Sequence, residues 1–314
     1  GPFKLTSYTS GQQAAFERFD DYWGDKAHVD QLIVITMADA AAGMNALRSG
    51  QVDITYAVPY AEAKLIEADP RLKLLRNPST QYLPIYMRTD LEPFTDPRVR
   101  MALKLIANRE QLVKVAMNGY GAIANDMVGR YLPCGETPVA QRVREIDKAK
   151  ALLAEAGKSD LKLEITTASD VPGLAQTAQV FAAQAKEAGV DIKVTILEAT
   201  AYLANYTNWP LGVDFFNDMY LPLVSRTLLP GGPFNVSRWN DEEFVSLARQ
   251  AFATTEEAKR CDLIEKMRVI EYERGGSIVW GWSDILNAYT GNVQNLLPHK
   301  VDSALSHLNK VWLA

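Results

Sequence analysis

Residues 161–197 constrain the fold most, because they contain a complete strand–helix–strand unit. Apolar and polar residues alternate over residues 161–166, which predicts a half-buried strand. Alternation resumes over residues 190–196. Between these strands, apolar residues recur every three or four positions, as on the buried face of a helix: Leu174, Ala178, Phe181, Ala185 and Ala188. A helix between two strands predicts a right-handed parallel crossover, and therefore an α/β fold.

Polar residues follow the first strand of this unit. Ligands of α/β folds bind at the carboxyl ends of parallel strands, which here are residues 167–170 and include Ser169 and Asp170. The same two side chains can instead cap the following helix, with Pro172 near its first turn. Capping is the commoner role for such residues, and the two roles can coexist.

The size and charge of the chain exclude several classes of protein. Its 314 residues and 34.8 kDa suit two domains, and 47% hydrophobic with 23% charged residues is an ordinary globular composition. A net charge of −5 argues against a nucleic-acid binder, which would show a basic face. No apolar run approaches the roughly 20 residues that cross a bilayer. The absence of a charged-then-apolar leader fits either a cytoplasmic protein or the processed form of an exported one.

The two cysteines, Cys134 and Cys261, form no zinc or redox motif. Cys134 lies in a loop rich in Gly and Pro, and Cys261 lies in a predicted helix. Pairing of such distant cysteines cannot be derived from spacing. We therefore expect two unpaired thiols, with a disulfide as the alternative.

Strand and helix signals alternate through the rest of the chain. A turn at Ser10 and Gly11 predicts a hairpin between residues 3–8 and 15–19. Asp39 and Gly50 bracket a predicted helix. The other principal predictions are a buried strand at 32–35, strands at 52–56, 72–75, 81–88, 213–216 and 277–282, helices at 61–68, 97–106, 109–117, 147–156, 241–253 and 255–272, and a long loop at 118–138.

Signals for catalysis and for cofactors are weak. The chain has no Gly-x-Ser-x-Gly elbow and no His-Glu-x-x-His motif. Residues 119–121 lack the third glycine of a dinucleotide-binding loop, and the histidines show no metal-ligand spacing. We expect no enzymatic activity, no cofactor and no metal.

Several segments in order carry a family signature: Gly-Pro-Phe-Lys-Leu at 1–5, Asp-Tyr-Trp-Gly at 21–24, Ala-Leu-Arg-Ser-Gly-Gln-Val-Asp-Ile at 46–54, Pro-Phe-Thr-Asp-Pro-Arg-Val-Arg-Met-Ala-Leu at 93–103 and Lys-Ala-Lys-Ala-Leu-Leu-Ala-Glu-Ala-Gly at 148–157. The chain resembles the family 5 extracellular solute-binding proteins of ABC importers, of the oligopeptide- and dipeptide-binding type. The resemblance spans nearly the whole sequence. Locally, these residues have structural roles: Gly50 and Gly157 end helices, Pro97 begins one and Trp23 is expected to plug a hairpin end.

The resemblance implies a periplasmic-binding-protein-like α/β fold (type II, cluster C-like), with one complete lobe and one incomplete lobe. Residues 81–284 would form the complete lobe, and residues 1–80 with 285–314 the incomplete one. The chain would then be the carboxyl-terminal portion of a longer protein. Residues 1–80 should expose apolar surface, because part of their lobe is absent.

The implied function is capture of a small solute, such as a peptide, between two lobes and its delivery to the permease subunits of an ABC importer. The implied location is extracytoplasmic, and we expect a monomer that binds no nucleic acid. The alternative is the ligand-sensing domain of a cytoplasmic transcriptional regulator with the same fold. The sequence upstream of this chain would distinguish an export signal from a helix-turn-helix.

Candidate ligand-binding residues follow the strand at 213–216. They are Phe216, Asn217, Asp218, Met219 and Tyr220. In the family this position usually carries Gly-Trp and then an acidic residue that binds a peptide's amine. Here Met219 and Tyr220 replace the pair, and Leu223 replaces the acid, so Asp218 is the nearest substitute. Its alternative role is a solvated carboxylate at a strand end.

Aromatic residues mark the two predicted crossings between lobes. They are Tyr82, Tyr86, Trp280 and Trp282. Aromatic side chains at period two on a strand lie in the core more often than in a pocket, so we expect about one in three of them to touch ligand. Arg226 is a candidate anchor for a ligand carboxylate, with an exposed surface arginine as the commoner alternative.

Overall fold

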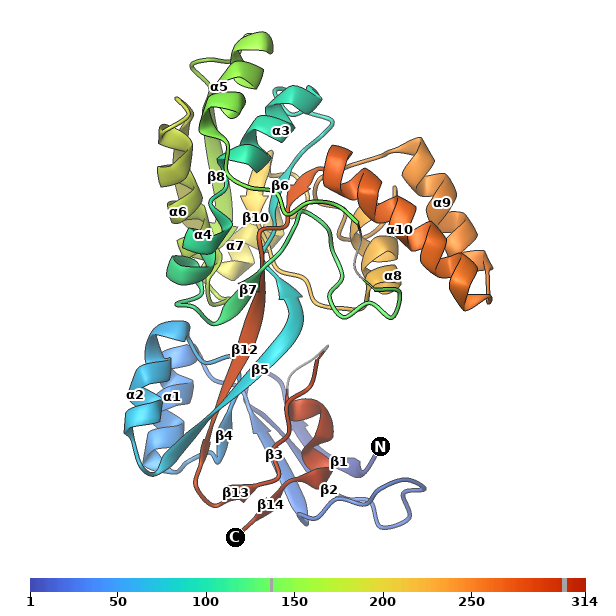
Figure 1. Ribbon diagram of the computed structural model, residues 1–314. Coiled ribbons are helices and arrows are strands. Elements are labelled where there is room, and N and C mark those ends of the chain that lie inside the picture. The colour runs from blue at the N-terminus through green and yellow to red at the C-terminus, as the bar shows by residue number, and fades with distance from the viewer. Residues whose placement is uncertain (136–137, 301–303) are drawn as a thin grey trace. The chain divides into compact units, whose positions relative to one another are not determined.

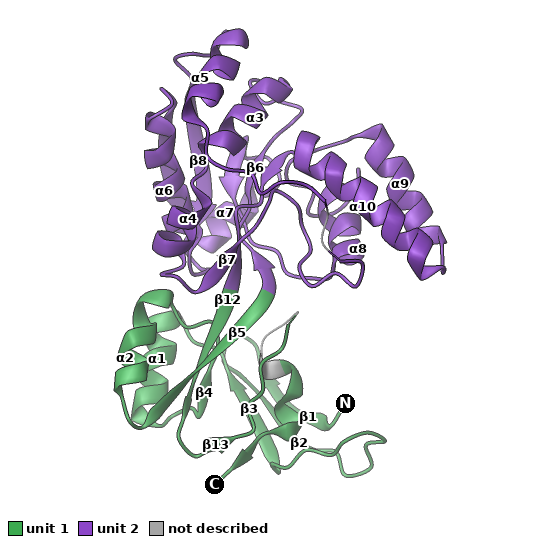
Figure 2. Cartoon of the chain, viewed as in Figure 1, with its two compact units in different colours: residues 1–79, 284–314 green, residues 80–283 purple. Residues whose placement is uncertain are grey.

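The computed structural model describes residues 1–135, 138–300 and 304–314, and the chain divides into two compact units (Figure 1 and Figure 2). Unit 1 comprises Gly1–Ser79 and Asp284–Ala314, and unit 2 comprises Thr80–Ser283. The chain passes from unit 1 to unit 2 within strand β5 (Leu72–Tyr82) and returns within β12 (Gly281–Thr290).

Unit 1 contains an antiparallel sheet in the order β1–β2–β3 (Phe3–Thr9, Gln13–Arg18 and Gln31–Ile35). Thr9 pairs with Gln13 across the turn, which confirms the predicted hairpin. The unit also holds α1 (Ala40–Ser49), β4 (Ile54–Thr55), a 3₁₀ turn (Tyr60–Glu62), α2 (Ala63–Ala68), β13 (Val293–Gln294), a 3₁₀ segment (Ala304–Lys310) and β14 (Trp312–Leu313).

Helix α1 forms where the sequence predicts it. The Asp39 carboxylate accepts a hydrogen bond of 2.8 Å from the backbone N–H of Ala42 and so caps the first turn. Gly50 ends the helix with a φ of 76°, a left-handed conformation that glycine adopts without steric cost. Met44 and Leu47 are buried on the inner face.

The β1–β2–β3 sheet of unit 1 exposes apolar side chains. The prediction of a buried strand at residues 32–35 is wrong, since Ile33 and Val34 are 54% and 50% exposed. Trp23 is 90% exposed, so it plugs no hairpin end. Tyr8 and Val34 both align with Ala14 in the ladder, which places them on one face, and Tyr8 is also exposed. The expected apolar surface in residues 1–80 is thereby confirmed.

Unit 2 is built on a five-stranded sheet in the order β11–β6–β10–β8–β9. Strands β8 (Lys162–Ala168), β9 (Asp191–Leu197) and β10 (Leu211–Val213) are parallel, while β6 (Ile85–Met87) and β11 (Ser277–Ile278) complete the sheet in antiparallel pairs. Helix α6 (Leu174–Lys186) connects β8 to β9 and packs on β8, β9 and β10 (Figure 1). The predicted strand–helix–strand crossover is confirmed.

The N-terminal end of α6 lacks the side-chain cap that the sequence predicts. Gly173 is the N-cap residue, with no side-chain hydrogen bond, so the prediction that Ser169 or Asp170 caps this helix is wrong. Both residues are exposed, which leaves their side chains available for contacts at the strand end.

The remaining elements of unit 2 are α3 (Pro97–Ile106), α4 (Arg109–Ala116), β7 (Gly121–Ile123), α5 (Ile146–Glu155), α7 (Ala199–Ala204), α8 (Tyr220–Leu223), a π-helical turn (Val224–Leu228), α9 (Glu242–Ala253) and α10 (Glu257–Arg274).

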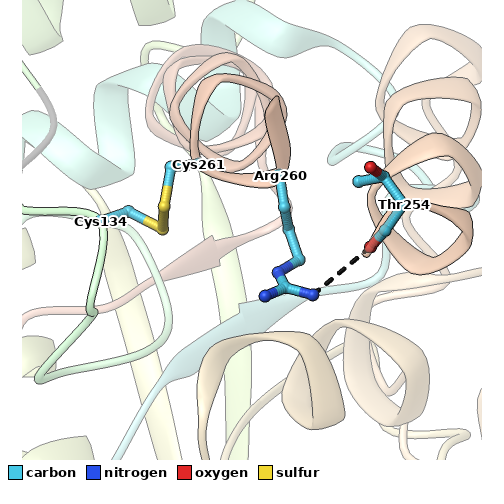
Figure 3. Close-up of a disulfide and its surroundings, with 4 residues drawn as sticks. All are labelled: Cys134, Thr254, Arg260 and Cys261. Atoms are coloured by element: carbon cyan, nitrogen blue, oxygen red, sulfur yellow. Dashed lines mark hydrogen bonds between the residues drawn. A yellow bond between two sulfur atoms is a disulfide. The ribbon is translucent and has the colours of Figure 1, made fainter. Parts of the chain in front are cut away.

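A disulfide joins the loop after β7 to helix α10. The sulfur atoms of Cys134 and Cys261 are 2.09 Å apart and their Cα atoms 5.1 Å apart (Figure 3). The expectation of two unpaired thiols is therefore wrong. Figure 3 shows that Arg260, which precedes Cys261, points away from the disulfide, and its guanidinium donates to the carbonyl of Thr254 at 3.4 Å. Folding places the two cysteines together although 127 positions separate them, which no local pattern could reveal.

A buried carboxylate lies at the base of the same loop. One oxygen of Asp126 accepts hydrogen bonds from Arg109 Nη2 at 2.7 Å and from Arg142 Nε at 2.6 Å. All three side chains are buried. The carboxylate therefore forms ion pairs with two guanidinium groups in the interior of unit 2.

Candidate functional site

Strands β8 and β10 end side by side. Thr166 pairs with Gly212, and the Thr167 hydroxyl donates to the carbonyl of Val213 at 2.9 Å. A side chain at position 212 would place its Cβ 2.4 Å from the Tyr86 hydroxyl, so only glycine fits there. The two strand tips are adjacent, as the sequence predicts.

Strand β10 covers Leu211–Val213 and not residues 213–216. The regular ladder ends at Val213, although backbone hydrogen bonds to residues 82 and 84 continue as far as Phe216. The Asp214 carboxylate accepts from the Tyr206 hydroxyl at 2.6 Å and from its neighbour Phe215 N–H at 2.8 Å. Phe216 then makes an isolated bridge to Tyr82. The strand therefore ends at Val213, and Asp214 follows it directly, three residues before Asn217.

Asp214 is a buried acidic residue at the strand ends that sequence reasoning missed. Burial raises its pKa to about 6; hydrogen bonds from Tyr206 and from the Phe215 N–H oppose the shift, and the charge of Asp170 adds to it. The residue thus changes charge at mildly acidic pH. A single acidic residue directly after a short apolar strand is the only sequence signal that could have indicated it.

Asp218 and Arg226 lie together on the next segment. One carboxylate oxygen of Asp218 accepts from the backbone N–H of Met219 at 2.8 Å, and the other accepts from Arg226 Nη1 at 2.9 Å. The Arg226 guanidinium lies over the ring of Phe234. The sequence interpretations treated the acid and the arginine separately, whereas the structure forms an ion pair. A ligand amine or carboxylate binding here would compete with that pair.

The predicted aromatic residues pack mostly in the core of unit 2. Tyr82, Tyr86 and Trp280 are at most 1% exposed, and Phe216, Tyr220 and Trp282 are also buried. The rings of Phe216 and Trp282 lie 5.9 and 5.5 Å from the ring of Tyr82. Asn217 and Met219 are half-buried. These aromatic side chains form the layer that supports the strand ends, and Trp282 also lines a pocket.

Tyr220 connects the strand-end segment to α10. Its hydroxyl donates to one oxygen of Glu271 at 3.3 Å, and the other oxygen of Glu271 accepts from the Val128 N–H at 2.8 Å. Burial raises the pKa of Glu271 to about 7, although Arg268 and the bonded N–H and hydroxyl groups act in the opposite direction. Glu271 therefore holds a proton in the folded protein at a pH where it would be ionised in water.

We expect stability to fall as the pH rises from about 4.5 to about 7. In this window the unfolded chain loses the Glu271 proton first, so rising pH favours unfolding, by up to ~3 kcal/mol in total. Glu271→Gln should flatten this part of the profile in urea titrations. Glu273→Gln, on the exposed side of the same helix, is the matched control and should leave the slope unchanged. An unchanged slope in the Glu271→Gln variant would contradict the assignment.

The described residues contain no group of three or more His, Cys, Asp or Glu side chains placed to hold a metal ion. In the same part of the chain, no helix is both long and apolar enough to span a membrane. At the ends of two parallel strands, unit 2 has the Asp218–Arg226 ion pair and exposed polar residues, and the buried carboxylate of Asp214 lies directly after one of these strands. Such a surface can bind a small polar solute through hydrogen bonds and charge.

Comparison with known proteins identifies the family. A sequence model described as bacterial extracellular solute-binding proteins, family 5 middle, matches residues 1–221. The chain belongs to this family. It is 26% identical over 285 residues to a glutathione-binding protein of Pectobacterium atrosepticum, covering 83% of this chain and 54% of that protein. It is 24% identical over 302 residues to the dipeptide-binding protein of Escherichia coli, covering 91% and 56%. The chain thus spans about half the length of these curated relatives.

The fold is that of the solved family 5 proteins. The nickel–histidine complex of NikZ from Campylobacter jejuni superposes with a TM-score of 0.90 at 18% identity, over 99% of this chain and 67% of that one. The expected periplasmic-binding-protein-like fold is confirmed. At this identity the match reports the fold, and the ligand of that protein does not transfer to this chain.

Proposed function

We propose that this chain is part of the solute-binding component of an ABC-type importer, which captures a small solute and delivers it to membrane permease subunits. The observation that carries the proposal is the family 5 match over residues 1–221. Relatives named for glutathione and for dipeptides favour a peptide or peptide-like solute. No catalytic step is part of this role.

We assign the solute contacts of unit 2 to the ends of β8 and β10. Asp170 and Asp214 provide negative charge for an amine, while Arg226, once released from Asp218, provides a guanidinium for a carboxylate. Ser169 and Asn217 supply neutral hydrogen-bonding groups on the same segments. The Tyr82–Phe216–Trp282 layer beneath them keeps these segments in place.

The burial of apolar side chains supports the proposed division into one complete and one incomplete lobe. Unit 2 has its own sheet and helical cover, which suits one complete lobe. In unit 1, apolar side chains on the β1–β2–β3 sheet are exposed, among them Leu5, Tyr8 and Val34. We infer that further polypeptide covers this sheet and completes the second lobe, since such apolar surface usually marks an interface.

An extracytoplasmic location is consistent with the Cys134–Cys261 disulfide, because structural disulfides persist in oxidising compartments. The same bond counts against the alternative of a cytoplasmic regulator, in which thiols are kept reduced. No observation in the fold or in the family match favours that alternative.

A thermal-shift screen of the full-length protein with dipeptides, tripeptides, glutathione, sugars and opines tests the proposal. A solute that binds only the folded state at about 100 times its Kd adds about 2.7 kcal/mol of stability, so the cognate class should raise Tm by several degrees. Arg226→Gln should weaken binding of a carboxylate-bearing solute about tenfold or more. Arg249→Gln, an exposed arginine on α9, is the control. Stabilisation by no solute in the screen would count against the import role.

A further inference from the structure

Asp214 is a buried acidic residue that has no counter-charge. It is 5% exposed, and its carboxylate accepts hydrogen bonds from two neutral donors, the Tyr206 hydroxyl at 2.6 Å and the Phe215 N–H at 2.8 Å. In the part of the chain that the structure describes, no lysine, arginine or histidine forms an ion pair with Asp214, and Arg226 pairs with Asp218 instead. Transfer of a carboxylate from water to the interior is costly without an opposite charge, so buried carboxylates are usually paired.

A second carboxylate follows the neighbouring strand. Strand β8 ends at Ala168 and Asp170 comes two residues later, while Asp214 follows β10 directly. The two strand tips are joined by the hydrogen bond from the Thr167 hydroxyl to the Val213 carbonyl. The negative charge of Asp170 favours proton uptake by Asp214. Because Asp170 is exposed, a solute can reach this pair of acids from its side.

The other titratable groups that face Asp214 are tyrosines. Tyr202 lies on α7 and Tyr206 follows that helix, whereas Tyr86 lies on β6 and Tyr82 on β5. Burial raises the pKa of each tyrosine, and the charge of Asp214 raises it further. Among these buried groups, therefore, only Asp214 changes charge near pH 6, since burial raises its pKa to about 6.

A cationic group of the solute would supply the missing charge. An ammonium or guanidinium group beside Asp170 compensates both carboxylates, whereas in its absence a proton neutralises Asp214 at acidic pH. We propose that the cationic group of the solute and a proton compete at the Asp170–Asp214 pair, so that the protein captures its solute at neutral pH and releases it on acidification. This inference rests on the import role proposed above and adds to it the charge of the solute and the control of its release.

The affinity for an amine-bearing solute should therefore fall with the pH. A peptide amine stays protonated from pH 5 to pH 7, so a change of affinity in this range reflects a change in the protein. If the solute binds only the ionised form of Asp214, which is half populated at about pH 6, its Kd should be about tenfold higher at pH 5 than at pH 7.

Titration calorimetry of the full-length protein with L-alanyl-L-alanine, reduced glutathione and the N-acetyl form of each provides the test. The measurements are made at pH 5, 6 and 7 in two buffers that differ in ionisation enthalpy, which gives the number of protons released on binding. The two amine-bearing solutes should release about half a proton at pH 6. Their N-acetyl forms carry no cation, so they should bind more weakly and release no proton.

Four variants distinguish this role from a purely structural one. Asp214→Asn should remove the dependence of affinity on pH. Tyr206→Phe removes a hydrogen bond that favours the ionised carboxylate and should move the midpoint of the profile to higher pH, while Asp170→Asn should move it to lower pH. Asp160→Asn, an exposed acid elsewhere in unit 2, is the control and should leave the profile unchanged. A structural role alone would not move the midpoint in opposite directions.

The result that overturns this inference differs from the one that overturns the import role. An affinity that is constant from pH 5 to pH 7, equal binding of the parent and N-acetyl solutes, or an unchanged pH profile in Asp214→Asn would refute competition with a proton and leave the import role intact. Binding of sugars alone in the thermal-shift screen would do the same. If no solute of any class binds, the import role fails and this inference fails with it.

Discussion

Asp126→Asn should destabilise unit 2 by about 3–5 kcal/mol, the usual cost of removing one partner from a buried ion pair. The substitution keeps the shape of the side chain and removes the charge that compensates Arg109 and Arg142. It also retains tolerance of the left-handed backbone at this position, where φ is 58°. Any loss of stability therefore reports the charge and not backbone strain.

Urea denaturation followed by tryptophan fluorescence measures this effect, because Trp209, Trp239, Trp280 and Trp282 all lie in unit 2. The control is Asp90→Asn. Asp90 pairs with Arg88 at 2.7 Å but its side chain is 46% exposed, so its loss should cost less than about 1 kcal/mol. Similar shifts of the urea midpoint in the two variants would show that the buried Asp126 pairs contribute no more to stability than the exposed Asp90 pair.

Removal of the disulfide should cost about 2–5 kcal/mol. The bond closes a loop of more than a hundred residues, and cross-linking such a distance restricts the unfolded chain strongly. The expected result is a lower urea midpoint for unit 2 under reducing conditions and for the double variant Cys134→Ser with Cys261→Ser.

The double variant supplies its own control, because its stability should not respond to reductant. The oxidised wild-type chain should show no thiol that reacts with a thiol reagent under denaturing conditions. Detection of two reactive thiols, or equal stability with and without reductant, would mean that the bond contributes nothing to the fold. Loss of the bond should also expose the loop around Cys134 to proteolysis before the rest of unit 2 unfolds.

Local sequence signals predicted much of the fold. The hairpin of β1 and β2, the helix between Asp39 and Gly50 and the β8–α6–β9 crossover all form as expected. Each depends on periodicity, capping or turn chemistry within a few residues. The start of α6 was misplaced because Pro172 and its polar neighbours looked like a cap, whereas the helix begins after Gly173.

The candidate site was only partly predictable. Proximity of the β8 and β10 tips follows from parallel topology, and Asp218 and Arg226 were both named as candidates. Their mutual ion pair and the burial of Asp214 depend on the path of the chain after β10. The regular strand ends at Val213, before most of the predicted strand, and the Asp214 carboxylate binds Tyr206 and the Phe215 N–H.

The sequence by itself determined the class of fold, the family and the order of most elements, because these depend on patterns among neighbouring residues. The tertiary structure alone decided which cysteines meet, which charges are buried and which apolar strands remain exposed. Three contacts join segments that approach only after the chain has folded. They are the bond between Cys134 and Cys261, the hydrogen bond between Val128 and Glu271, and the ion pairs of Asp126 with its two arginines. Burial and pairing depend on those long-range contacts, and the periodicity of residues along the chain does not predict which contacts form.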